Sequence, residues 1–130
     1  MPEDVGTERQ RRATDVPNSR QRKVLAGIEL RYVVTMNLAV HGPATVVEII
    51  ELLEYQGFVI AGRASKTVSD ALRWEMRRGR VRRIRRGKYG AGQMPRSTEH
   101  YIHKRAIALR EEADRRIGRD DDAFWDSMLA

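Results

Sequence analysis

Residues 77–88 form a dense basic stretch that also contains apolar residues and glycines. Eight of its twelve residues are Arg or Lys, Val81 and Ile84 lie among them, and Gly79 and Gly87 bracket them. An unstructured basic tail needs neither apolar side chains nor glycines, whereas a short β-hairpin uses both. The stretch therefore predicts a hairpin that is folded and strongly cationic.

The expected hairpin consists of two strands, residues 80–85 and 88–91. Gly87 lies at its tip, where a positive φ is needed. Three apolar side chains are expected to pack back onto the rest of the fold: Val81, Ile84 and Tyr89.

The excess of positive charge is confined to one window. The 130 residues include 25 Lys and Arg and 18 Asp and Glu, a formal net charge of +7. Residues 60–90 hold eleven of the basic residues and two of the acidic ones, while the flanking segments are close to neutral. Such a concentration indicates a polyanionic partner. Arg outnumbers Lys by 21 to 4, which reflects either phosphate recognition by guanidinium groups or the codon usage of a GC-rich genome.

Several protein classes are not expected from this composition. The chain has no cysteine, so disulfides and thiol chemistry are excluded. No apolar run reaches the roughly 18 residues of a membrane span, and residues 1–20 lack the apolar core of a secretory signal, so we expect a cytoplasmic protein. No nucleophile motif, phosphate-binding loop or inward carboxylate pair indicates an enzyme. We predict no metal ion, because His100 and His103 lack further converging ligands. We also predict no cofactor or small-molecule ligand, because no sensor domain is evident in the sequence.

The first predicted helix spans residues 21–40 and ends before Gly42-Pro43. Its apolar residues recur at four-residue spacing. The side chains expected to be buried are Val24, Ile28, Tyr32, Met36 and Val40, with Leu25, Val33 and Ala39 beside them.

The second predicted helix spans residues 45–56. Thr45 and Glu48 form a T-x-x-E capping box, and Gly57 is placed to end the helix. Residues 58–60 are expected to form a short strand or to pack as a loop. The buried face is expected to contain Val46, Ile49, Ile50 and Leu53.

The third predicted helix spans residues 65–78, with Ser65 or Thr67 as its N-cap and Gly79 after its end. Trp74 lies between the two faces of this helix and is interpreted as a residue at the rim of the core. The inward face is expected to contain Val68, Ala71, Leu72 and Met76, and the outward face Lys66, Ser69, Asp70, Arg73 and Arg77.

A fourth helix is predicted over residues 98–117, with a stripe of Ile102, Ala106, Leu109, Ala113 and Arg116. This narrow stripe suits either a homodimer contact or packing on the helix's own domain. The expected organisation is a disordered arm (1–20), one domain (21–95), a C-terminal helix (96–118) and an acidic-hydrophobic tail (119–130).

Three helices followed by a hairpin are the order of the winged helix-turn-helix family, and three stretches resemble it. Residues 44–50, ATVVEII, resemble the start of the family's second helix. Residues 67–73, TVSDALR, resemble the start of its recognition helix, and GRVRRI (79–84) with RGKY (86–89) resembles its wing. The resemblance covers residues 24–91, and the hairpin here is unusually basic. The implied fold is mainly α with a small β-hairpin (α+β), a winged helix-turn-helix with an extra C-terminal helix.

The resemblance implies double-stranded DNA binding, with helix 65–78 in the major groove and the hairpin on the flanking backbone or minor groove. A transcription regulator or a nucleoid-associated protein would use these parts. The candidate DNA-binding residues are Ser65, Lys66, Thr67, Ser69, Arg73 and Arg77 on the helix, and Arg80, Arg82, Arg83, Arg85, Arg86 and Lys88 on the hairpin.

Two alternatives stay open at this point. Some winged helices bind proteins, so the basic surface would then face an acidic partner in a larger assembly. An RNA-binding protein is the second alternative, although the chain lacks the closely spaced aromatic residues of a base-stacking platform.

Overall fold

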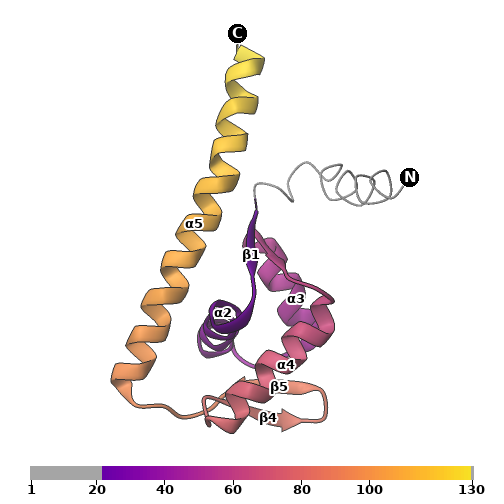
Figure 1. Cartoon of the computed structure of the whole chain (residues 1–130), viewed down its shortest axis with the longest axis vertical. Helices are drawn as coiled ribbons and strands as arrows, with labels where there is room; N and C mark the ends of the chain where they lie inside the picture. Colours follow the sequence, from indigo (N-terminus) through magenta and orange to yellow (C-terminus); the bar gives the residue numbers. More distant parts are fainter. Residues whose placement is uncertain (1–21, 130) are drawn as a thin grey trace, which may run out of the picture.

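The computed structural model describes residues 22–129, with side chains described for residues 22–117 (Figure 1). The arm predicted for residues 1–20 lies outside this part of the chain, as do the side chains of the predicted tail. The elements, in chain order, are β1 (Lys23–Leu25), α2 (Gly27–His41), β2 (Ala44–Thr45), α3 (Val46–Tyr55), β3 (Phe58–Ile60), α4 (Ala64–Arg77), β4 (Val81–Arg85), β5 (Lys88–Ala91) and α5 (Arg96–Leu129).

The described chain is α+β and contains two small sheets. β2, β5 and β4 form an antiparallel sheet in that order, while β1 and β3 form a parallel pair. α2 passes through the centre of the molecule, and α5 runs along one side of it (Figure 1). Within residues 22–129, no helix combines the length and the apolar character needed to cross a membrane.

The prediction of a helix over residues 21–40 is wrong at its start. Residues 23–25 form β1, which pairs with β3 in the register Lys23↔Phe58 and Leu25↔Ile60, so α2 begins only at Gly27. The predicted stripe therefore crosses a break between a strand and a helix. Several residues expected inside are exposed: Val24 (49%), Ile28 (47%), Val40 (60%) and Ala39.

The buried residues of α2 are Leu30 and a continuous run from Val33 to Leu38, not a periodic stripe. α2 packs against α4 on one side and α5 on another, so little of its circumference remains in contact with water. This sandwiched position also buries two polar residues. Thr35 is bonded as described below, and Asn37 exchanges amide hydrogen bonds of 2.7 and 3.1 Å with Gln56 after α3.

α3 matches its prediction closely. The Thr45 backbone N–H donates to Glu48 Oε1 (2.9 Å), and the Glu48 backbone N–H donates to Thr45 Oγ1 (3.2 Å), which completes the expected capping box. The hydrogen bond from the Thr45 backbone N–H is the main cause of the lowered pKa of the Glu48 carboxyl. Gly57 follows the helix with a φ of 95°. Residues 58–60 were predicted to form a short strand or a loop, and they form the strand β3.

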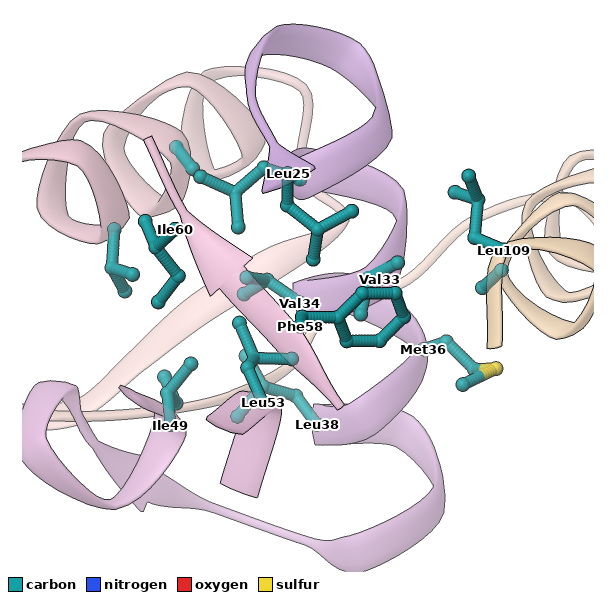
Figure 2. Close-up of a cluster of buried hydrophobic side chains, with 14 of the residues drawn as sticks. Leu25, Val33, Val34, Met36, Leu38, Ile49, Leu53, Phe58, Ile60 and Leu109 are labelled. Carbon is teal, nitrogen blue, oxygen red and sulfur yellow. The ribbon is translucent and has the colours of Figure 1, made fainter. Parts of the chain in front are cut away.

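The core lies between α2, α3, α4 and β3, and α5 closes one side of it (Figure 2). Phe58 on β3 is completely buried among Leu25, Val34 and Leu53. α5 contributes the stripe that the sequence predicts, because Ile102, Ala106, Leu109 and Ala113 are all at most 4% exposed.

α5 is longer than predicted, and its apolar stripe packs on the domain of the same chain. The helix extends from Arg96 to Leu129, and the stripe packs on α2 and β1 of the same chain. Arg116, the fifth predicted member, instead forms an ion pair with Glu112 at 2.9 Å. The predicted homodimer is not tested by this packing, but these apolar residues are no longer free to form it.

A buried carboxylate connects α2, α4 and the start of the hairpin. Glu75 on α4 is completely buried; its two oxygens accept hydrogen bonds from Arg80 Nε (2.7 Å) and a terminal nitrogen of Arg80 (2.6 Å). The Thr35 hydroxyl of α2 donates to Glu75 Oε1 at 2.9 Å. Arg80 lies just before β4, so this cluster ties the hairpin to two helices.

Replacement of Glu75 by Ala should lower the free energy of unfolding by about 3–5 kcal/mol, because it leaves the largely buried guanidinium of Arg80 without its carboxylate. Urea denaturation followed by circular dichroism measures this change. The matched control is Glu51→Ala on the exposed face of α3, which should change stability by no more than about 0.5 kcal/mol. Equal effects of the two substitutions would show that the buried cluster does not stabilise the fold.

Candidate nucleic-acid interface

The predicted hairpin is present, and both strands lie within one residue of their expected bounds. Gly87 lies at the tip with a φ of 78°, Val81 is 2% exposed, and Tyr89 is half-buried against the core. The prediction that Ile84 packs onto the helices is wrong, since Ile84 is 42% exposed.

The position of Ile84 follows from an irregularity in the strand pairing. Arg83 pairs with Tyr89 but Arg85 pairs with Lys88, so Ile84 is an extra residue in β4. Its side chain lies over Gly90, where a Cβ would stand only 3.0 Å from Ile84 Cδ1. The bulge thus keeps Ile84 on the face of the small sheet, away from the helices.

The base of the hairpin is closed by a tight crossing of two glycine-containing segments. The Gly92 N–H donates to the Arg80 carbonyl (2.8 Å), and the Gln93 N–H donates to the Gly79 carbonyl (2.9 Å). A Cβ on Gly92 would collide with the carbonyl oxygen of Gly79. β2 then pairs with β5, in the register Thr45↔Lys88, so the hairpin also contacts the start of α3.

The hairpin carries five cations that form no ion pair with any described carboxylate: Arg82, Arg83, Arg85, Arg86 and Lys88. The four arginines are exposed and Lys88 is half-buried. Arg82 Nε donates to the Ala91 carbonyl at 3.2 Å, which holds the stem of that side chain along the hairpin. These groups can bind an anion without breaking an existing ion pair.

Arg80, which was also predicted to bind DNA, is not among these unpaired cations. Its side chain is only 14% exposed and is held by Glu75, and this hydrogen bonding raises the pKa of the Arg80 guanidinium above its usual value. The periodicity of the hairpin cannot reveal this partner, because the carboxylate belongs to α4.

α4 begins at Ala64, one residue earlier than predicted, and the N-cap prediction is wrong. Arg63 is the N-cap and makes no side-chain cap hydrogen bond, so Ser65 and Thr67 lie within the first turn. The Thr67 hydroxyl donates to the Ala61 carbonyl at 2.8 Å in the preceding loop. This hydrogen bond occupies Thr67, while Ser65 is exposed and Ser69 is half-buried.

The outer face of α4 carries a row of alternating charges. Asp70 is bonded to Lys66 at 2.8 Å and to Arg73 at 3.4 Å, and the contact with Lys66 is the main cause of the lowered pKa of Asp70. Asp70 therefore positions Arg73. Arg77, one turn further on, is exposed and has no carboxylate partner among the described residues.

Trp74 is 42% exposed beside this face, at the rim of the core as expected. The guanidinium of Arg31, on α2, lies 4.8 Å from the ring centroid, and that of Arg78 lies 5.6 Å from it. Sequence reasoning missed both arginines. Arg78 lies four residues after Trp74, a spacing that helical periodicity could have shown, but Arg31 comes from another helix.

A hollow of about 450 Å³ opens between the start of α2 and α4, next to the outer face. Ile28 and Arg31 of α2 and Asp70 and Trp74 of α4 are among its lining residues. In the same described part of the chain, no three His, Asp or Glu side chains converge in a way that could hold a metal ion.

No family model matches the chain, and no curated protein or solved structure is significantly similar to it. The geometry itself shows an amphipathic helix with cations on its outer face, followed directly by a hairpin with five unpaired cations. A surface of this kind can bind a polyanion over a distance of several phosphates.

Proposed function

We propose that the chain is a winged helix that binds double-stranded DNA, with α4 as the recognition helix and the β4–β5 hairpin as the wing. Support comes from the order α2, β2, α3, α4, β4, β5 and from the pairing of β2 with β5. This order matches the expectation from the resemblance, in which three helices precede a hairpin.

The observation that carries the proposal is the unpaired charge of the hairpin. Glu75 pairs with Arg80, yet the five neighbouring cations on the hairpin form no ion pair with a described carboxylate. Like charges held this close together repel one another, so a bound polyanion stabilises the arrangement. The regularly spaced phosphates of a DNA duplex form such a polyanion.

The two parts have different roles in this proposal. The hairpin cations contact phosphates and supply affinity that does not depend on sequence. Lys66, Arg73 and Arg77 on α4 approach base edges in the major groove, where Arg and Lys recognise guanine. A transcription regulator or a nucleoid-associated protein would combine both roles.

The first test is a salt titration of duplex binding, measured by fluorescence anisotropy with one A/T-rich and one G/C-rich duplex. If the five hairpin cations contact phosphates, log K should fall with log salt at a slope of about −4 to −5. Binding that survives physiological salt and prefers one duplex supports the proposal. No binding at low salt contradicts it, and binding that ignores sequence and vanishes with salt leaves only non-specific attraction.

The double substitution Arg85→Ala and Arg86→Ala should weaken binding to both duplexes alike and make the salt slope shallower by about 2, because two phosphate contacts are lost. The matched control is Lys104→Ala with Arg115→Ala, which removes two exposed cations from α5 that form no described ion pair. An equal change in slope for the control pair would show that net charge, and not the hairpin, determines affinity.

The substitution Arg73→Ala should reduce discrimination between duplexes by about 1–3 kcal/mol and leave the salt slope nearly unchanged.

The substitution Asp70→Ala should increase the affinity for every duplex, since it removes a negative charge and frees Lys66 and Arg73. Discrimination between duplexes should fall, because Arg73 loses its orientation. Competition between labelled and unlabelled duplexes measures both effects. If Arg73→Ala behaves like the hairpin double substitution, the proposed division of roles is wrong.

A further inference from the structure

Two arginines from different helices share the indole ring of Trp74. The guanidinium of Arg31, on α2, lies over the ring at 4.8 Å from its centroid, and that of Arg78, at the end of α4, lies at 5.6 Å. Neither arginine forms an ion pair with a described carboxylate. Two cations gathered on one ring repel each other, so an anion that binds both would stabilise the arrangement.

The ring holds these cations without using their hydrogen-bond donors. A guanidinium is planar and its N–H groups point outward within its plane, so a ring against its face leaves the donors free. The Nε of Arg31 is buried and has no hydrogen-bond partner among the described residues, so the position of this group depends on its contact with Trp74. A side chain held in place before binding loses less conformational entropy when a ligand arrives.

Trp74 lines two hollows that these cations also line. The hollow of about 450 Å³ between α2 and α4 includes Arg31, and a second hollow, of about 190 Å³, is lined by Trp74, Arg77 and Arg78. Asp70 is the only acidic residue that lines either hollow, and it already forms two ion pairs with other side chains. The surroundings of the ring are therefore suited to an anionic ligand.

The place of this cluster in the chain indicates which anion it binds. Trp74 directly follows Arg73 on α4, and Arg78 lies three residues before β4 begins at Val81. The cluster thus adjoins both parts of the candidate interface, and a duplex that contacts them has backbone phosphates nearby. Arg can bind a phosphate through two parallel hydrogen bonds, which the free edges of the guanidiniums provide.

We propose that Arg31 and Arg78, held by Trp74, bind phosphates of the DNA backbone, so that α2 contacts the duplex together with α4 and the hairpin. This inference rests on the proposed function and extends its contact surface to a third element. Phosphate contacts fix the orientation of a protein on the duplex and carry no sequence information. Arg31 and Arg78 therefore position α4 in the groove, and Trp74 acts through them without stacking on a base.

The number of phosphate contacts can be measured from the salt dependence of binding. The five hairpin cations alone account for a slope of about −4 to −5, and two further contacts make it about −6 for the natural chain. The double substitution Arg31→Gln and Arg78→Gln should make the slope shallower by about 2 and weaken binding to both duplexes by roughly tenfold or more at physiological salt. Combined with Arg85→Ala and Arg86→Ala, it should make the slope shallower by about 4.

The matched control is Lys104→Gln with Arg115→Gln, two exposed cations of α5, which should leave the slope unchanged. If the hairpin substitutions change the slope and the substitutions of Arg31 and Arg78 do not, this inference is wrong while the proposed function stands. If the natural chain binds neither duplex, the inference and the proposed function both fail.

The role of the ring is tested by two substitutions that leave every charge in place. Trp74→Leu should weaken binding to both duplexes several-fold, because the two guanidiniums lose the surface that holds them. Trp74→Phe keeps an aromatic ring and should retain most of the affinity. Circular dichroism checks that both variants are folded. Equal affinities of Trp74→Leu and the natural chain would overturn the proposed role of Trp74.

Discussion

The hairpin depends on the buried carboxylate of Glu75. A fully buried charge is costly unless it is paired and its remaining acceptor sites are hydrogen-bonded, and Arg80 and Thr35 meet both requirements. Because Arg80 immediately precedes β4, this pairing places the first strand of the hairpin relative to α2 and α4. The crossing at Gly79 and Gly92 then closes the hairpin base, and the pairing of β2 with β5 connects it to α3.

Features that depend on neighbouring residues could be predicted from the sequence. The capping box at Thr45, the turn at Gly87 and the buried stripe of α5 each follow from local spacing, and the structure confirms all three. The first helix could not be predicted well, because its burial is determined by α4 and α5 on two sides and its start by pairing with β3.

In the candidate site too, features set by local sequence could be predicted, and features set by the packing of distant elements could not. The outward position of Lys66, Arg73 and Arg77 on α4 follows from helical periodicity, and the exposed hairpin cations follow from composition. The removal of Arg80 from the surface could not be predicted from the hairpin pattern, since its partner Glu75 belongs to α4 and is itself buried by the packing of α4 against α2. Arg31 joins Trp74 only because α2 packs beside α4.

The arginines of this chain make different interactions in different parts of the fold. Arg80 uses its guanidinium fork to hold both oxygens of a buried carboxylate, a geometry that Lys cannot reproduce. Arg105 and Arg116 form partly exposed ion pairs on α5, which contribute little to stability. On the hairpin, Arg82, Arg83, Arg85 and Arg86 gather without described counterions, and Arg77 and Arg78 precede them without one. Codon usage would raise the arginine content throughout the chain, but it would not concentrate these unpaired arginines within ten residues. The position of the unpaired group, directly after α4, is therefore stronger evidence for a polyanionic partner than the arginine content.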